Sequence, residues 1–147
     1  TAVTENRLIG LYRACEELGL EIPPEYVREC AYHDPDRCAQ VTRELLALPE
    51  RPSCILFPDD YSYIGGLNAL NEAGLRVPED ISVVGYDDYL YPGLCNVEIT
   101  SYGVDMGLMA YTAIEMLTKK IEGCDYQKGL HVVPGYLIEK ESVRKRN

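Results

Sequence analysis

No apolar run in the 147-residue sequence approaches the roughly 18 residues of a membrane-spanning helix, so we expect no transmembrane segment. No basic and then apolar leader opens the chain, so no export signal is visible and a cytoplasmic location is expected. Basic residues are also scarce, with 14 Lys and Arg against 24 Asp and Glu and a net charge of -10. Such a surface repels phosphate backbones, and the one basic cluster, Arg144 to Arg146, ends the chain. These residues alone are not expected to bind nucleic acid.

Metal-ligand spacings are missing as well. His33 and His131 lie far apart, and none of the six cysteines is spaced as a zinc-ligand pair, so neither a metal nor a cofactor is expected. An even number of cysteines permits disulfides, but that pattern belongs to small secreted domains without a sufficient core. Several of the cysteines occupy apolar positions of helix or strand patterns, where cysteine behaves as a small hydrophobic residue. We expect reduced thiols at Cys15, Cys30, Cys38, Cys54, Cys95 and Cys124.

Helical periodicity predicts four helices. Each of them begins or ends at a recognisable signal, such as the Asp34-Pro35-Asp36 start or the glycine stops at Gly19, Gly74 and Gly123. The glycine pair 65–66 falls inside the third helix pattern, where close packing is the usual reason. The methionines of the last helix lie on its apolar stripe and are expected to fill core. The predicted helices cover Glu5–Leu18, a segment from Asp36 to Leu48, Tyr61–Ala73 and Asp105–Glu122.

Short apolar runs between these helices predict strands. Strand centres near Arg28, Ile55 and Val83 are separated by similar lengths of chain with a helix in each interval. This is the spacing of βαβ units, and their right-handed crossovers give an α/β fold with a doubly wound parallel sheet. The expected strands are Tyr26–Cys30, Cys54–Phe57, Ile81–Tyr86 and a short one at Val97–Thr100, followed by extended segments at Leu130–Val133 and Tyr136–Ser142.

Acidic pairs follow two of the expected strands, at the sheet edge where open parallel sheets bind ligands. Asp59 and Asp60 follow one strand, and Asp87 and Asp88 follow the next. Carboxylates there can accept hydrogen bonds from vicinal hydroxyls or act as a general acid and base. The simpler interpretation is that Asp60 and Asp88 cap or turn the chain. No nucleophile elbow or phosphate-cradling glycine loop is present, so we expect no catalytic residues.

The segment 74–88, GLRVPEDISVVGYDD, resembles the signature of LacI/GalR-family transcriptional regulators. The resemblance extends outward in both directions. Arg7 to Gly10 resembles the family's R-x-x-G helix start, and Pro58-Asp59-Asp60 with Gly65 resembles its A-N-D block. Ile99 to Gly107 resembles its L-T-T strand and following helix. Resemblance thus covers essentially the whole sequence.

This resemblance implies a two-lobed, type I periplasmic-binding-protein-like fold. The chain would supply the C-terminal lobe, residues 1–98 and 136–147, with a crossover helix and strand, 103–134, that belong to the N-terminal lobe. The DNA-binding head and most of the N-terminal lobe would be absent. Truncation would expose a sheet edge and the apolar stripe of the last helix, which favours self-association.

By resemblance, the effector is gripped by Arg7 and Asp87 and stacks on Tyr32. Asp59 stands where the family often has Asn, so a donor is replaced by an acceptor at this ligand-binding position. The family also dimerises through the helix near residue 61 and the loop after the acidic turn. That implies a homodimer surface containing Tyr61, Tyr63, Ile64, Tyr89, Leu90 and Tyr91.

We therefore predict the effector-binding and dimerisation domain of a LacI-type repressor. A small polar effector, a sugar by preference, would control DNA binding through the absent head, with no membrane partner. Two alternatives stay open. One is a periplasmic sugar-binding protein of an ABC transporter, which an export leader would select. The other is a sugar-processing enzyme that uses Asp59 with Asp87.

Overall fold

The computed structural model describes residues 2–90, 92–125 and 127–145, with side chains from residue 5 onward. Four helices and four strands alternate along much of the chain, with a short 3-10 helix at Pro24–Tyr26. All four predicted helices are present. The helices are α1 (Ala2–Leu18), α2 (Pro35–Leu46), α3 (Asp60–Glu72) and α4 (Met106–Ile121), and the strands are β1 (Cys54–Leu56), β2 (Ser82–Asp87), β3 (Thr100–Val104) and β4 (Gly135–Ile138).

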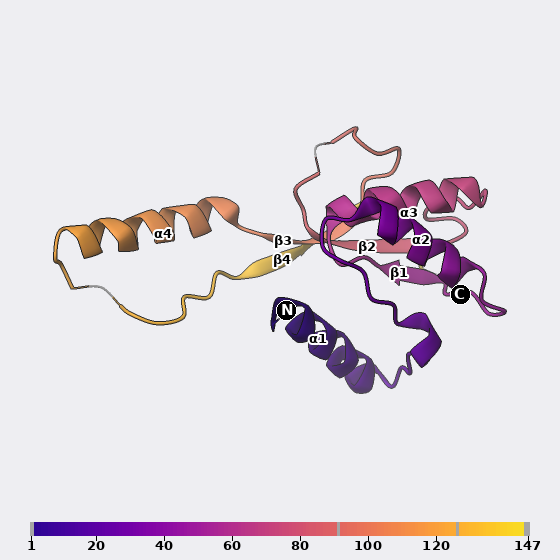
Figure 1. Cartoon of the computed structure of the whole chain (residues 1–147), viewed down its shortest axis with the longest axis horizontal. Coiled ribbons are helices and arrows are strands. Elements are labelled where there is room, and N and C mark those ends of the chain that lie inside the picture. Colours follow the sequence, from indigo (N-terminus) through magenta and orange to yellow (C-terminus); the bar gives the residue numbers. More distant parts are fainter. Residues whose placement is uncertain (1, 91, 126, 146–147) are drawn as a thin grey trace.

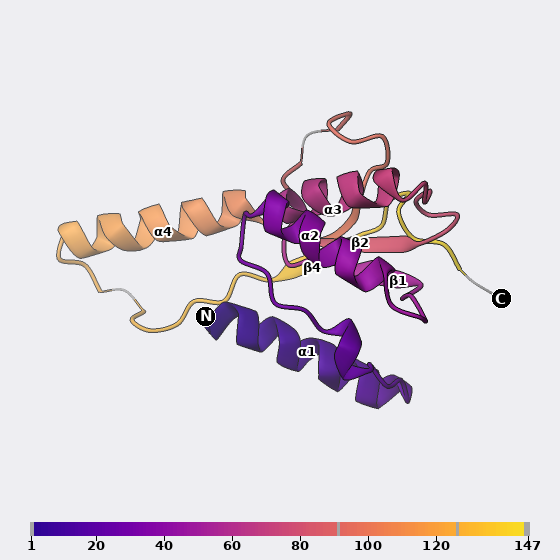
Figure 2. The ribbon, with the colours of Figure 1, turned by 45° about the vertical axis from the view of Figure 1, so that its right-hand side comes forward.

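The strands form one sheet in the order β1-β2-β3-β4. β1 and β2 are parallel, as the βαβ spacing predicted, β3 adds to β2 in the same direction, and β4 pairs antiparallel with β3. α2 and α3 lie together beside the sheet, and α1 lies apart from both (Figures 1 and 2). The α/β fold class is therefore confirmed, with an antiparallel strand added at one edge.

The core lies between the sheet and the α2–α3 pair. Val83, Leu70 and Tyr63 have no exposed surface, and Phe57 packs edge-on against Tyr63 with ring centroids 5.4 Å apart. Close helix packing depends on the two adjacent glycines predicted for this reason. A methyl group on Gly65 would overlap the carbonyl group of Pro35, and one on Gly66 would overlap the ring of Phe57.

Two strand predictions need correction. The strand expected at Tyr26–Cys30 is absent. Tyr26 ends the short 3-10 helix, and the extended residues that follow pair with no strand of the described chain. The strand expected at Val97–Thr100 begins only at Thr100. Ile99 is buried in the core, but the ladder with β2 starts at Thr100.

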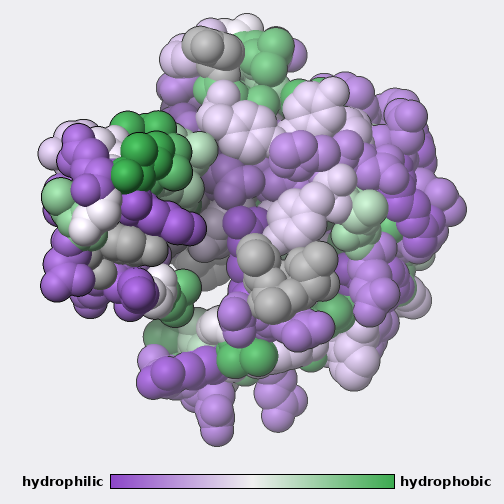
Figure 3. All heavy atoms as spheres, turned by 60° about the vertical axis from the view of Figure 1, so that its left-hand side comes forward, coloured by the Kyte–Doolittle hydropathy of each residue, from purple (hydrophilic) through white to green (hydrophobic). Residues whose placement is uncertain are grey.

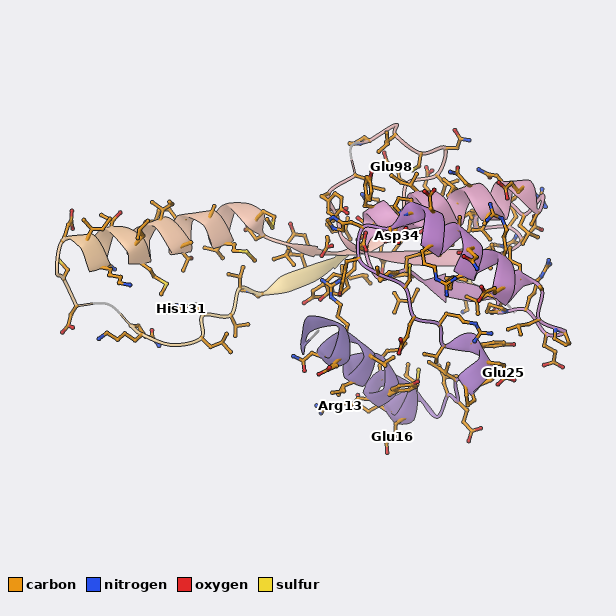
Figure 4. All side chains as sticks on the ribbon, viewed as in Figure 1. Arg13, Glu16, Glu25, Asp34, Glu98 and His131 are labelled. Atoms are coloured by element: carbon orange, nitrogen blue, oxygen red, sulfur yellow. The ribbon has the colours of Figure 1, made fainter. Side chains whose placement is uncertain are left out.

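The largest departure concerns the segment 105–134, which projects from the end of the sheet as an arm (Figure 1). No described residue of α4 is buried, although its methionines were expected in a core. Met106 is 63% exposed, Ile121 76% and Leu130 90%. The extended segment Leu130–Val133 joins no sheet. Figure 4 shows His131 on the return half of this arm, well away from the sheet and the helices α1 to α3, which together form the lobe.

Ser142 joins β2 to β3 near the start of both strands. Its hydroxyl donates to the Val83 carbonyl oxygen at 2.7 Å and accepts from the Thr100 N–H at 2.7 Å. The backbone N–H of Val83 in turn donates to the Ser142 carbonyl oxygen at 2.9 Å. Ser142 is fully buried, so no water can replace its hydroxyl.

Ser142→Ala is therefore expected to lower the free energy of unfolding by about 2 kcal/mol, since it leaves a buried donor and a buried acceptor without partners. Urea denaturation followed by circular dichroism measures this loss. Ser53→Ala, at an exposed position just before β1, serves as the control and should change stability by less than about 0.5 kcal/mol. Equal losses in the two variants would contradict the bridging role of Ser142.

Candidate functional site

The candidate site lies where β1 and β2 end, at the edge of the sheet from which the arm projects. Figure 3 brings this end forward and shows a hollow beside the arm, bordered largely by hydrophilic residues of the lobe. Because open parallel sheets bind ligands at the carboxyl ends of their strands, this is the edge where a site was expected.

Arg7 reaches this edge from α1. Its guanidinium donates to the Pro58 carbonyl oxygen at 2.7 Å and to Asp87 Oδ1 at 3.1 Å. Its Cζ atom lies 3.5 Å from the centroid of the Tyr86 ring and 5.3 Å from that of Tyr32. Arg7 thus bonds to residues that follow or end β1 and β2 and stacks on the Tyr86 ring. These contacts fix the orientation of its guanidinium group.

The acidic turn after β2 has an unusual backbone. Asp87 has φ 99° and Asp88 φ 53°, so two consecutive non-glycine residues are left-handed. Aspartate tolerates this region better than most residues, and such strained positions gather at functional sites. The turn sends the two carboxylates in different directions. Asp87 meets Arg7, while Asp88 Oδ1 accepts from Lys140 Nζ at 2.8 Å.

The Arg7–Asp87 pair is partly open to solvent, with side-chain exposures of 24% and 27%. Only one Asp87 oxygen is bonded to Arg7, and several guanidinium N–H groups have no partner within the described chain. With the adjacent rings of Tyr86 and Tyr32, the cluster offers donors, an acceptor and an aromatic face. That combination suits a small cyclic ligand that carries hydroxyl or amide groups.

Three of the four predicted ligand residues, Arg7, Asp87 and Tyr32, are therefore brought together. Tyr86 was missed. The sequence signal for Tyr86 was its position directly before Asp87, at the end of the predicted strand. Neighbouring strand residues point to opposite faces of a sheet, but a turn at the strand end can bring both side chains to the same edge. Lys140 was also missed, because it comes from the far end of the chain.

Asp59 does not belong to this cluster, contrary to prediction. It is fully buried and caps α3, where Oδ1 accepts from the Ser62 N–H at 2.8 Å and from the Tyr89 hydroxyl at 3.4 Å. Oδ2 accepts from the Ser62 hydroxyl at 2.8 Å and from the His33 N–H at 3.2 Å. Both oxygens are thus bonded to protein donors, so Asp59 caps α3 and also holds His33 and Tyr89 at the start of that helix.

The capping role had been predicted for Asp60, which instead lies beneath the site. Its side chain is buried, Oδ1 accepts from the Ser101 hydroxyl at 2.9 Å, and Oδ2 has no partner within the described chain. Burial raises the pKa of Asp60 to about 6, against the opposing effect of the Ser101 hydrogen bond. Because Ser101 also accepts from the Asp88 N–H at 3.2 Å, it connects this buried acid to the acidic turn.

Only some of the residues predicted to form the dimer surface are exposed. Tyr61 and Tyr89 are 43% and 40% exposed, and both rings lie about 6 Å from the His33 ring. Ile64 and Leu90 are half-buried. Tyr63 is wrong as a contact residue because it is fully buried in the core, and Tyr91 lies outside the described residues. Helical geometry explains the error, since only one face of α3 can point outward.

Among the described residues, no group of three or more His, Cys, Asp and Glu side chains is arranged to hold a metal ion. None of the helices in that part of the chain has the length and apolarity to cross a membrane.

Residues 1–143 match the family model described as a periplasmic binding protein-like domain. The chain is similar to the HTH-type transcriptional repressor PurR of Haemophilus influenzae strain PittEE, with 32% identity over 92% of this chain and 41% of the repressor. It is also similar to PurR of Pasteurella multocida strain Pm70, with 27% identity over 97% of this chain and 42% of the repressor. It thus spans about two fifths of these curated relatives.

Solved structures of LacI-type regulators are also similar to this chain. A LacI-type transcription regulator from Bifidobacterium animalis has a TM-score of 0.87 and 27% identity, over 97% of this chain and 51% of that one. The lac repressor dimer bound to operator and the anti-inducer ONPF has a TM-score of 0.84 and 26% identity, over 97% and 49%. A LacI-family sugar-binding transcriptional regulator from Escherichia coli, complexed with phosphate, has a TM-score of 0.81 and 26% identity, over 93% and 49%.

Proposed function

This chain belongs to the periplasmic binding protein-like domain family, as its resemblance to LacI/GalR regulators predicted, and we propose that it is the effector-binding part of a LacI-type transcriptional repressor. The observation that carries the proposal is the Arg7–Asp87 pair, stacked on Tyr86 at the carboxyl end of β2. The repressors and regulators found to be similar favour this function over the binding protein of a transporter. They also favour a regulator over an enzyme.

In this proposal each residue has a distinct role. Arg7 donates to hydroxyl or carbonyl oxygens of the effector, and Asp87 accepts from its O–H or N–H groups. Tyr32 covers its flat or apolar face, while Tyr86 supports the Arg7 guanidinium that stacks on it. Binding either adds a third partner to the Arg7–Asp87 pair or separates the two side chains. A sugar fits this donor and acceptor set, and one similar structure is that of a sugar-binding regulator.

The arm is proposed to complete a second lobe. Its apolar side chains are exposed along its whole length, with Leu108 44%, Tyr111 68% and Ile114 62% exposed. Such a surface is unfavourable in water unless another polypeptide segment covers it. We assign residues 103–134 to the N-terminal lobe of the same protein, which would close over the site with the effector between the lobes. The lobe angle would then control a DNA-binding head.

The test uses the natural protein that contains this chain. A panel of monosaccharides and nucleobases is screened for thermal stabilisation, since a ligand that binds only the folded state raises the melting temperature. Arg7→Gln is expected to weaken binding of any hit about 10- to 100-fold, because charge-assisted hydrogen bonds are lost. Arg13→Gln is the matched control, on the same helix but exposed and, among the described residues, paired with Glu17. Equal affinity in both variants, or no hit that alters operator binding, would refute the proposal.

Dimerisation is proposed through Tyr61, Ile64, Tyr89 and Leu90. Tyr61 and Tyr89 present aromatic surface outside the lobe, and aromatic residues are enriched at interface cores. Tyr61→Glu would place a charge there and should convert a dimer into a monomer, as measured by sedimentation equilibrium. Glu72→Gln, at the exposed far end of α3, should leave the dimer intact. A dimer that survives Tyr61→Glu would rule this surface out.

A further inference from the structure

Two cysteines converge on one backbone carbonyl beside the candidate site. The Cys30 thiol donates to the Asp34 carbonyl oxygen at 3.9 Å, and the backbone N–H of Cys38 donates to the same oxygen at 3.0 Å. The side chains of the two cysteines also lie near enough to influence each other's pKa. Both are free thiols in this structure.

The surroundings of the two sulfurs differ. Cys38 is 3% exposed in the core, where its thiol contacts Thr42. Cys30 is half-buried and packs against the core cluster that contains Cys38. Cys30 is therefore the more accessible residue of the two, and Cys38 lies deeper in the core. Redox-active pairs have this arrangement, with an accessible cysteine beside a resolving one.

We propose that Cys30 and Cys38 form a reversible intramolecular disulfide when hydrogen peroxide oxidises this domain. The inference goes beyond the proposed function and does not depend on it, because the bridge requires only the positions of the two sulfurs. It identifies a modification site on the segment that joins the candidate site to α2.

The chemistry is a two-electron oxidation of the thiol pair. The Cys30 sulfur attacks one peroxide oxygen, the O–O bond breaks, and the leaving hydroxide takes the thiol proton as water. The Cys38 sulfur then attacks the Cys30 sulfenic acid, the S–O bond breaks, and hydroxide leaves with the Cys38 proton as a second water. Burial raises the pKa of Cys30 and raises that of Cys38 to about 12, so the reaction should accelerate as pH rises.

The bridge would enclose the segment that carries Tyr32 and His33. His33 already has φ 55° and donates its backbone N–H to Asp59, so the segment is held closely to the start of α3. Figure 4 shows Asp34, whose carbonyl both cysteines contact, at the start of α2. A covalent closure there would restrict the position of Tyr32 relative to Arg7.

The test is a peptide map of the full chain after treatment with hydrogen peroxide, with remaining thiols blocked by alkylation. Trypsin cuts after Arg28, Arg37 and Arg43, which places the two cysteines in separate peptides, 29–37 and 38–43. We expect these peptides to appear joined, with a mass about 2 Da below their sum, and to separate on reduction. The joined species should exceed any other cysteine pair at least about tenfold.

Three variants complete the design. Cys30→Ser should abolish the linked peptides and leave Cys38 alkylated, whereas Cys124→Ser, at an exposed position beyond α4, should leave the linkage unchanged. Should Cys38→Ser fail to fold, the wild-type map and Cys30→Ser still decide the question. Cys30 recovered as sulfinic or sulfonic acid without the linked peptides would overturn the proposal. Equal linkage of Cys30 to several cysteines would overturn it too.

Discussion

Replacing Gly65 with alanine is expected to lower the free energy of unfolding by about 3 kcal/mol, the largest loss we expect from a single methyl group in this chain. The added Cβ would overlap the carbonyl group of Pro35, at the start of α2. Because the obstacle is backbone rather than a flexible side chain, the two helices would have to separate. Urea denaturation with both circular dichroism and tyrosine fluorescence measures the change.

Two further glycines give graded controls. The Cβ added by Gly66→Ala would overlap the Phe57 ring. Because this side chain can shift, a smaller loss of unfolding free energy is expected. Gly10→Ala, in α1 with no atom near its added Cβ, should instead stabilise the chain by about 0.5–1 kcal/mol, since alanine favours helices over glycine. Similar losses at Gly65 and Gly10 would show that helix contact does not determine the effect.

Asp60→Asn is expected to change how stability depends on pH. Burial raises the pKa of Asp60 from 3.8 to about 6, so the folded state binds a proton more tightly than the unfolded state. The stabilisation by the protonated acid is complete below about pH 4 and is lost as pH rises through about 6. The variant should therefore be about as stable as wild type at pH 4 and about 3 kcal/mol more stable at pH 7.5. Thermal or urea unfolding at several pH values measures the difference.

Asp80→Asn tests the sign of this effect. Hydrogen bonds from Arg76 lower the pKa of Asp80 to about 2, so its stabilisation is present above its ordinary pKa of 3.8 and is lost as pH falls through about 2. The variant should thus be less stable than wild type at neutral pH and approach it in acid. If Asp60→Asn and wild type differed by a constant amount from pH 4 to 7.5, Asp60 would not be the titrating group.

Much of the fold was predictable because its signals are local. Asp34-Pro35 starts α2 as a cap and a first-turn proline, and the Asp34 carboxylate accepts from the Arg37 N–H as a cap should. The apolar run that became β2 needed no knowledge of its neighbours. Arg7, Tyr32 and Asp87 came from resemblance, since separations of tens of residues carry no local signal for contact.

The errors share one physical cause, which is that tertiary contacts choose among locally equivalent alternatives. Asp59 and Asp60 are adjacent carboxylates, and the sequence allows either to cap α3. The hydrogen bonds from the His33 N–H and the Tyr89 hydroxyl select Asp59. The stripe on α4 has the pattern of a buried helix, but no described segment of the chain covers it. An apolar pattern predicts that a face can be buried, and says nothing of which segment buries it.

The pairing of β3 with β4 means that the arm is an insertion within a hairpin. Val104 and Gly135 are direct partners across the ladder, so the chain leaves and re-enters the lobe at one point. The ends of the arm are therefore held together by the sheet, whatever the arm itself does. A short turn could replace residues 105–134 without moving Lys140 or Ser142, which would yield a compact domain that retains Arg7 and Asp87 for study in isolation.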